Sequence, residues 1–292
     1  MSPSRDSCDS IGCSMKRPAR HILPLLFAAG LFAGCAAQPS RVQTVAALET
    51  AIANPARPAA DRARDVWRHP RQTLLFFGLR QDQRVAEISP GAGGWYTQIL
   101  APVLRDHGHL IAAVPPVVPG NAYSERGAKA FSDLLASDPA RFDRVEVVEY
   151  TPGATAAFAA PGSLDLVLTF RNVHNWMGRG QAEAAFADFY RALKPGGVLG
   201  VVEHRGNELV PQDPKAGSGY VNQAYAVRLI EAAGFRLVGV SEVNANPRDT
   251  KDYPRGVWTL PPVYTEGDKD RAKYTAIGES DRFTLKFIKP RR

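Results

Sequence analysis

The stretch Val85-Ala-Glu-Ile-Ser-Pro-Gly-Ala-Gly-Gly-Trp-Tyr96 decides the fold, because it reads as a strand, a glycine turn and the start of a helix. Apolar residues lead to the acid Glu87, glycines follow at positions 91, 93 and 94, and residues 97–100 continue as a helical pattern. Glycine lets the backbone turn with positive φ and approach a ligand, while the free N–H groups of a new helix favour an anion. The stretch therefore predicts a loop that binds a small anionic or zwitterionic ligand.

The spacing of the glycines distinguishes between two kinds of cofactor. A dinucleotide fingerprint G-x-G-x-x-G that begins at Gly91 needs its third glycine at position 96, where this chain has Tyr96. NAD is therefore disfavoured, and S-adenosylmethionine is the expected cofactor.

Strand-like and helix-like segments alternate from Arg84 onward, which favours a doubly wound α/β sheet. Several strands are continuous apolar runs, as in parallel strands that are buried on both faces. A Pro- and Asp-rich loop joins the last two strands, so we expect the final strand to enter antiparallel. The seven expected strands are 85–88, 110–114, 145–150, 164–170, 198–202, 237–243 and 283–288, and helices are expected near 95–104, 125–135, 182–193 and 222–233.

The first 35 residues resemble an export leader. Basic residues after Met15 precede an apolar run over 22–34 that is too short to span a bilayer comfortably, and the run stops at Cys35. Phe32-Ala-Gly-Cys35 resembles the lipobox of bacterial lipoproteins, in which the cysteine is lipidated. We therefore expect a lipid-anchored protein of the bacterial cell envelope that faces the periplasm; the alternative is a cytoplasmic protein with an uncleaved or misread leader.

The remaining chain is long enough for one α/β domain. We expect a tether over 36–64, with a helix near 44–53, and a domain over 65–292 that opens with a helix pair over 65–79. The net charge of +7 includes charges ahead of Cys35, and no long basic run occurs, so no nucleic-acid partner is expected. No metal site is expected either, because histidines lack zinc-site spacing and no cysteine follows Cys35.

Taken together, these motifs resemble the class I S-adenosylmethionine-dependent methyltransferases, and within them a bacterial group that often carries export signals. Residues 87–94 resemble the first cofactor motif, 193–197 (Leu-Lys-Pro-Gly-Gly) the turn before strand five, and 231–235 (Glu-Ala-Ala-Gly-Phe) the approach to strand six. The resemblance covers about residues 65–290 and implies a Rossmann-like, mostly parallel seven-stranded sheet with its last strand antiparallel. The cofactor is then expected over the carboxyl ends of the first strands.

By this resemblance, Glu87, Ser89, Gly91, Gly93 and Gly94 are the expected cofactor-binding residues. Glu87 is expected either to hold the loop by accepting N–H groups or to bind the cofactor's ammonium. Ser89 stands where such enzymes usually have their first glycine. A second departure is that strand two ends in Val114-Pro-Pro116, where an acid normally binds the ribose hydroxyls; Asn121 or Tyr123 are candidate substitutes, and Glu149 is the nearest acid after strand three.

Polar residues follow strand four, where an apolar run ends, and this is a functional position in open α/β sheets. His174 is a candidate general base, because its ordinary pKa lies near neutrality, or else a hydrogen-bonded structural histidine. Arg171 and Asn172 complete the expected catalytic cluster. The expected substrate cleft comprises Asn175, Trp176, Glu203 and His204, although Trp176 also fits a core position and the last two also fit a solvated strand end.

The sequence thus predicts an S-adenosylmethionine-dependent methyltransferase that acts on a small molecule or an envelope component. An envelope lipoprotein that uses the same fold as a non-catalytic binding module is the alternative. The missing ribose acid favours the alternative, and the retained glycines with the polar cluster favour the enzyme.

Overall fold

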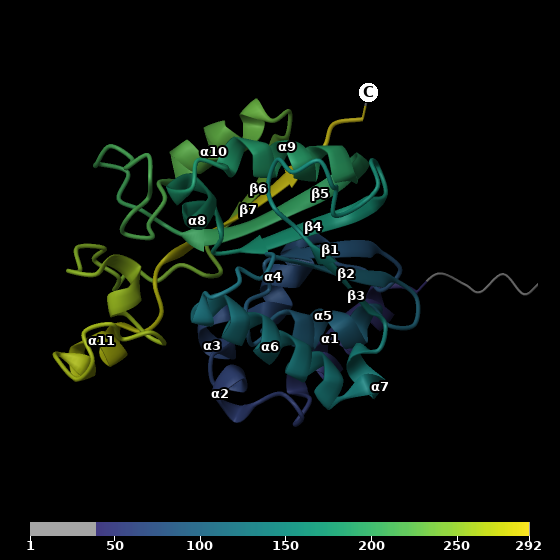
Figure 1. Cartoon of the computed structure of the whole chain (residues 1–292), viewed down its shortest axis with the longest axis horizontal. Helices are drawn as coiled ribbons and strands as arrows, with labels where there is room; N and C mark the ends of the chain where they lie inside the picture. The colour runs from purple at the N-terminus through teal and green to yellow at the C-terminus, as the bar shows by residue number, and fades with distance from the viewer. Residues whose placement is uncertain (1–38, 292) are drawn as a thin grey trace, which may run out of the picture. The chain divides into compact units, whose positions relative to one another are not determined.

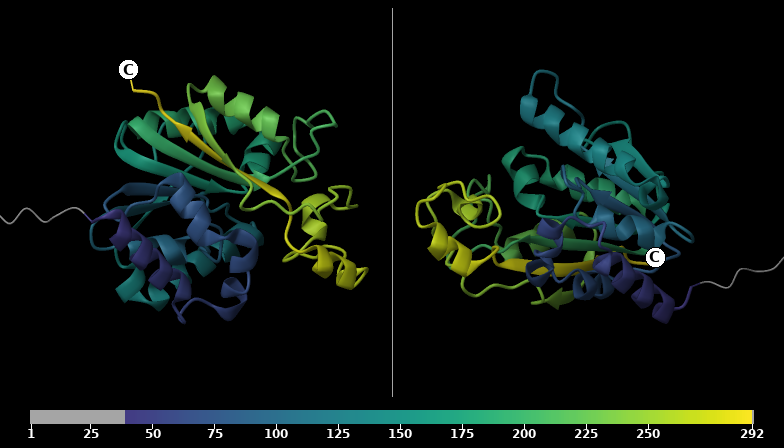
Figure 2. Two further views of the ribbon diagram at one scale, coloured as in Figure 1. Left: turned by 180° about the vertical axis from the view of Figure 1, so that it is seen from behind. Right: turned by 90° about the horizontal axis from the view of Figure 1, so that it is seen from below.

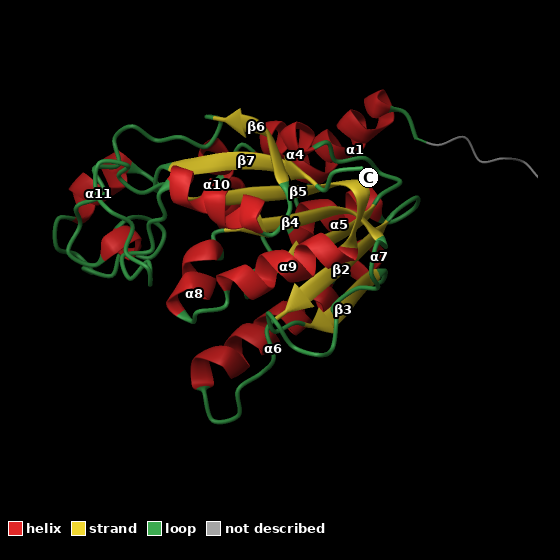
Figure 3. Cartoon of the chain, turned by 90° about the horizontal axis from the view of Figure 1, so that it is seen from above, coloured by secondary structure: helices red, strands yellow, loops and turns green. Residues whose placement is uncertain are grey.

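The seven predicted strands are present and form one mixed sheet in the computed structural model, which describes residues 39–291. The strand order is β3-β2-β1-β4-β5-β7-β6, and β7 runs antiparallel to both neighbours, as predicted. Figure 3 shows β6 and β3 at opposite edges. The bounds are β1 (Arg84–Ile88), β2 (His109–Val114), β3 (Val145–Glu149), β4 (Leu164–Phe170), β5 (Leu193–His204), β6 (Arg236–Ser241) and β7 (Arg282–Ile288).

Helices cover both faces of the sheet, because successive strand residues point to opposite sides. Val85 of β1 belongs to the apolar cluster of α1, α4 and α5, whereas Ala86 belongs to the cluster of α8, α9 and α10 (Figure 1). The helices are α1 (Arg41–Ala53), α2 (Ala59–Arg62), α3 (Asp65–Arg68), α4 (Pro70–Phe77), α5 (Thr97–Leu104), α6 (Ala122–Ser137), α7 (Pro139–Phe142), α8 (Val173–Gly178), α9 (Ala182–Ala192), α10 (Gln223–Ala232) and α11 (Arg271–Ile277), with a 3₁₀ turn η1 (Gly256–Thr259).

The compact unit begins earlier than the expected 65–292 domain. Ser40 caps α1 by accepting from the backbone N–H of Gln43, and the Gln43 side chain accepts from the backbone of Ser40, which is a capping box. Leu48 on this helix is fully buried in the same cluster as Leu100 of α5. The segment assigned to a tether therefore belongs to the core from α1 onward, and the compact unit takes in all of the described residues 39–291. The expected leader and Cys35 lie outside the described residues.

The carboxyl ends of β1, β4 and β5 meet at one end of the sheet, where β7 begins. His204 at the end of β5 pairs with Arg282 at the start of β7. The segment that carries η1 and α11, which connects β6 to β7, projects beyond this end of the sheet (Figure 2). Residues that are distant in sequence are thereby gathered around the carboxyl ends. Within residues 39–291, none of the helices has both the length and the apolar character that crossing a bilayer requires.

Candidate functional site

A pocket of about 160 Å³ lies between the carboxyl ends of β1 and β4. This is the end of an open α/β sheet at which ligands bind. Five of the expected site residues line it, namely Glu87, Ser89, Gly91, Arg171 and Asn172. The remaining lining residues are Arg68, Pro90, Trp95, Tyr96 and Phe170.

Two lining residues that are not glycine have left-handed backbones. Ser89, directly after β1, has φ of 51°, and Arg171, directly after β4, has φ of 62°. Such a conformation costs roughly 1–2 kcal/mol for a residue with a side chain. Hydrogen bonds from Ser89 N to Ala113 O at 2.8 Å and from Arg171 N to Val202 O at 2.7 Å hold the two residues in place. Strained residues of this kind gather at functional sites, and here both face one pocket.

Glu87 is an acid in an apolar setting. It is 2 % exposed, and Thr97 Oγ1 donates to its Oε2 over 2.6 Å. Burial raises the pKa of Glu87 to about 7, although the bond from Thr97 and the charge of Arg171 oppose that rise. The carboxyl group is therefore able to ionise when a cation, such as an ammonium group, arrives.

The three glycines of the turn have different surroundings. Gly91 has φ of 75° and lines the pocket. A Cβ on Gly93 would meet no atom within 4 Å, so open space lies beside it. A Cβ on Gly94 would come within 2.7 Å of Leu134 and 3.0 Å of Phe131. Gly94 is therefore required by the packing of α6 against the turn. Gly91 leaves room for a ligand in the pocket, whereas Gly93 is exposed and is not among the pocket's lining residues.

The residues after β4 separate into two groups. Asn172 Nδ2 donates to Ile88 O over 2.9 Å, so it joins the ends of β4 and β1 at the pocket. Asn175 is exposed, with its amide at 3.5 Å from Arg171 O. Trp176 is only 3 % exposed and packs against Phe186 and Phe189. The expectation that Trp176 lines the cleft is corrected, because α8 turns its indole into the core beneath α9.

A buried carboxylate joins the two expected histidines. Glu203 Oε1 lies 3.1 Å from His174 Nδ1 and accepts from His204 N over 2.8 Å, while its Oε2 accepts from His174 N over 3.3 Å. If Nδ1 of His174 donates to Glu203, its Nε2 is the acceptor. The Trp258 ring lies 6.0 Å from the His174 ring. None of the three residues is among those that line the pocket. Sequence spacing could not show this arrangement, because His174 lies on α8 and the other two residues end β5.

The same three residues are a candidate set of metal ligands, since one donor atom from each lies within 4.8 Å of the others. Two features disfavour a cation there. The Glu203 oxygens already accept backbone N–H groups and the His174 ring. Burial first, and then His174, Arg282 and Arg171, lower the pKa of His204 well below its ordinary value. The positive charges of the two arginines, which act on His204, also oppose a metal ion.

Sequence analysis missed a group of arginines beside the pocket. Glu279 accepts from Arg64 Nε over 2.6 Å and also contacts Arg68 and Arg282. Burial opposes ionisation of Glu279, but the charges of Arg282, Arg68 and Arg64 outweigh that effect and hold its pKa below the ordinary value. Arg68 and Glu279 are 211 positions apart, so no local motif could have indicated the cluster.

The expected substitutes for the ribose acid lie outside this pocket. Pro115, after β2, is exposed. The Asn121 side chain accepts from the N–H groups of Tyr123 and Ser124 and so caps α6, while Tyr123 is 84 % exposed. Glu149 is exposed at the end of the edge strand β3. None of these residues lines the pocket, and the structure therefore offers no evident replacement among them.

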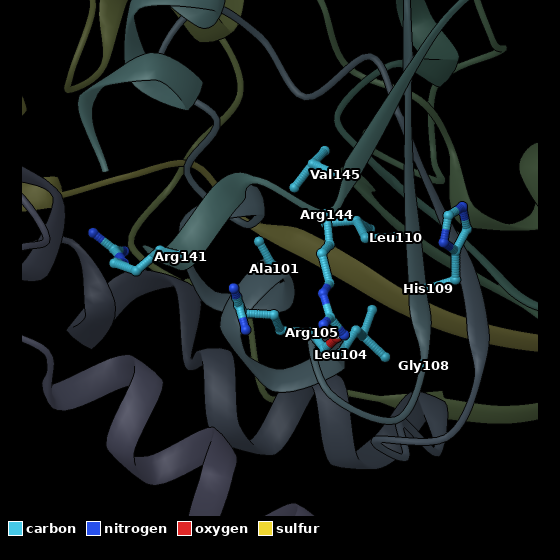
Figure 4. A pocket seen from close by; sticks show the side chains of 9 residues that line it. All are labelled: Ala101, Leu104, Arg105, Gly108, His109, Leu110, Arg141, Arg144 and Val145. Atoms are coloured by element: carbon cyan, nitrogen blue, oxygen red, sulfur yellow. Dashed lines mark hydrogen bonds between the residues drawn. The ribbon is translucent and has the colours of Figure 1, made fainter. Parts of the chain in front are cut away.

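A second hollow lies at the opposite end of the sheet, where β2 and β3 begin (Figure 4). It is lined by residues of α5, α7, β2 and β3 and of the turns beside them, among them Arg105, Arg141 and Arg144. Its volume of about 10 Å³ has room for roughly one water molecule. It is therefore too small for a cofactor.

Comparisons with known proteins support the fold. No family model and no curated protein matches the chain. Among solved structures, an S-adenosylmethionine-dependent methyltransferase from Aquifex aeolicus has a TM-score of 0.51 at 14% identity and covers 84% of this chain and 98% of its own. The cyclase SpnF has a TM-score of 0.51 at 17% identity, covering 85% of this chain and 93% of its own.

A third similar structure is phosphoethanolamine N-methyltransferase 2 from Haemonchus contortus with bound S-adenosyl-L-methionine. Its TM-score is 0.50 at 18% identity, and the match covers 85% of this chain and 57% of that one. At such identities the likeness concerns the fold alone. The chain thus has the class I methyltransferase fold, and its structural neighbours include S-adenosylmethionine-dependent methyltransferases.

Proposed function

We propose that this protein is an S-adenosylmethionine-dependent methyltransferase that acts on a small molecule or an envelope component. One observation carries the proposal: in a methyltransferase fold, the turn from Ser89 to Tyr96 and the end of β4 enclose a pocket at the carboxyl ends of the strands. A glycine turn that only joined a strand to a helix would need neither this pocket nor two strained residues that line it.

The lining residues fit the amino-acid end of the cofactor. Glu87, which lines the pocket, supplies a carboxyl group for the ammonium. Gly91, which has a positive φ, allows close approach of the backbone. When bound, S-adenosylmethionine supplies a methyl group on a positively charged sulfur.

The residues after β4 and β5 would act on the acceptor. Glu203 holds the imidazole of His174 in one orientation, so Nε2 is free to take a proton from a hydroxyl or an ammonium nucleophile. Asn172 fixes the spacing of the two strand ends. Alignment of this kind lowers the entropic barrier of an in-line transfer.

Calorimetry with S-adenosylhomocysteine tests the proposal on the full-length protein. Wild-type protein should give saturable binding, and Gly91→Val should abolish it, because Gly91 lines the pocket and the new side chain would occupy open space there. Gly120→Val is the matched control, since Gly120 also has a positive φ and no neighbours within 4 Å but does not line the pocket. An absence of heat at millimolar ligand, or equal loss in both variants, would refute the enzyme.

One observation favours a second candidate, a binding module without catalysis. The ribose hydroxyls of the cofactor lack an acid after β2, which costs a charge-assisted hydrogen bond of about 1.5–3 kcal/mol. Under this alternative S-adenosylhomocysteine binds no better than amino acids such as methionine, so the same calorimetry with methionine distinguishes the two.

We also propose that Cys35 carries a lipid that anchors the protein at the periplasmic side of the bacterial envelope. The support is the leader pattern that ends at Phe32-Ala-Gly-Cys35. Cys35→Ser should abolish fatty-acid labelling and membrane retention. Unchanged labelling or retention would overturn the anchor and leave the cytoplasmic alternative.

A further inference from the structure

We propose that Arg171 and Arg68 form a binding site for an oxyanion group, a phosphate or a carboxylate, of the methyl acceptor. The two residues line the pocket from opposite parts of the chain, one after β4 and one at the end of α3. The inference rests on the proposed function, and it names the chemical class of the acceptor.

The pocket has an excess of positive charge around it. Four guanidinium groups, those of Arg64, Arg68, Arg171 and Arg282, influence one another's ionisation, and Glu279 is the carboxylate among them. Glu87 offsets only part of this positive charge near pH 7, because burial raises its pKa to about 7. Buried charges normally have partners, so this excess of positive charge calls for an anion.

Arg171 shows where that anion belongs. Within residues 39–291, its guanidinium has no hydrogen bond and no ion pair within 4 Å, whereas the other three arginines all contact Glu279. Burial, and then the charge of Arg282, lower the pKa of Arg171 to about 10. A structural arginine would have an acceptor; this one is held at the pocket by a strained backbone and has none.

Arg68 completes the site. It is 3 % exposed, its Nε lies 3.5 Å from Glu279, and its guanidinium stacks 4.7 Å from the Trp95 ring centre. The indole and the salt bridge hold the guanidinium plane beside the pocket. Planar guanidinium groups bind phosphate and carboxylate in a bidentate manner, which suits an oxyanion better than a halide.

The acceptor is a better source of this anion than the cofactor. S-adenosylmethionine carries one carboxylate together with an ammonium and a sulfonium, so its binding adds net positive charge to a site that already has an excess. An anionic acceptor removes this conflict. The same charges would also attract such an acceptor toward the pocket.

Titration with inorganic phosphate at constant ionic strength tests the proposal, by calorimetry on the full-length protein with and without saturating S-adenosylhomocysteine. Wild-type protein should bind phosphate in both conditions. Arg171→Gln should weaken phosphate binding about tenfold or more, the loss expected for a charge-assisted bond. Arg71→Gln is the control, because Arg71 pairs with exposed Glu49 on the surface, and it should bind phosphate as the wild type does.

Thermal melting separates loss of the site from loss of the fold. Arg171→Gln should melt no lower than the wild type, since Arg171 has no partner to lose and its charge repels Arg282. Unchanged phosphate binding in Arg171→Gln, or no binding to the wild type, overturns the site. Displacement of phosphate by S-adenosylhomocysteine also overturns the proposal, because the arginines would then hold the cofactor's carboxylate. Arg171-dependent phosphate binding without any binding of S-adenosylhomocysteine refutes the proposed function but retains the anion site.

Discussion

At the scale of single residues, Glu87 is an ionisable side chain in an apolar environment, which disfavours its charged form. Its carboxyl group is nearly inaccessible, and Thr97 is the side chain that donates to it. The pKa of Glu87 is about 7 in the folded protein, against an ordinary value of 4.5 in the unfolded chain. Between these two pH values the folded protein keeps a proton on Glu87 that the unfolded chain has released. Stability therefore falls as pH rises from about 4.5 to about 7, and beyond that the loss is complete.

Glu87→Gln should remove this pH dependence. The variant cannot ionise, so its free energy of unfolding should exceed that of the wild type by up to about 3 kcal/mol above pH 7, and the gain should vanish near pH 4. Urea denaturation across this range measures the difference. Glu183→Gln, at an exposed position on α9, is the control and should show no such trend. If the difference in free energy of unfolding between Glu87→Gln and the wild type stays constant with pH, the raised pKa of Glu87 is contradicted.

The positions of these residues were predictable from sequence, but their conformations were not. The turn and the end of β4 contain five of the residues that the pocket gathers, because parallel strands place their carboxyl ends at one edge. Ser89 departed from the expected glycine, and its positive φ explains why glycine is usual there. Nothing in local sequence indicates that Arg171 has a left-handed backbone.

At the scale of elements, the glycine turn has two functions that the motif alone does not separate. Gly94 lies against Phe131 and Leu134 of α6, and Gly93 faces open space. Gly94→Ala should therefore destabilise the protein by roughly 1–3 kcal/mol, the usual cost of overpacking. Gly93→Ala should change the free energy of unfolding by less than about 0.5 kcal/mol. Chemical denaturation of the two variants measures these changes in free energy of unfolding. Equal changes would contradict the close packing of Gly94 against α6.

The elements themselves were predicted well where periodicity is strong. All seven strands, their number and the antiparallel last strand are confirmed, and α9 begins at the expected residue. The segment before residue 65 was assigned to a tether because its Pro, Ala and Arg content resembles a linker. Its helix α1 is nevertheless buried against α5, a tertiary contact that composition does not indicate. Trp176 was expected in the cleft because it follows β4. Its position on α8 instead directs the indole into the core, where it packs against Phe186.

At the scale of the whole molecule, one carboxylate joins the beginning and the end of the described chain. Glu279 lies just before β7, and its partners Arg64 and Arg68 lie at the start of α3 and at its end. Asp61 similarly accepts from Gln98 Nε2 over 2.8 Å, which attaches the same early segment to α5. These long-range ion pairs were beyond sequence reasoning, because only the fold brings their partners together.

Glu279→Gln should destabilise the protein by about 3–5 kcal/mol at neutral pH, because it leaves buried arginines without their carboxylate. The lowered pKa of Glu279 means that its contribution is complete above the ordinary pKa of 4.5 and is lost as pH falls below it. The gap between variant and wild type should therefore narrow in strong acid. Glu49→Gln removes an exposed pair and should cost less than about 1 kcal/mol. Similar losses of stability in Glu279→Gln and Glu49→Gln would contradict the stabilising role of Glu279 among the arginines.

Photochemical cross-linking of methyl-labelled S-adenosylmethionine tests the central claim most directly, because it reports both binding and location. Tryptic digestion separates residues 85–105, which contain the glycine turn, from residues 145–171, which end with the pocket residues Phe170 and Arg171. The account predicts label in one or both of these peptides, and its removal by excess S-adenosylhomocysteine. An absence of label, label confined to other peptides, or label that the competitor does not remove would contradict it.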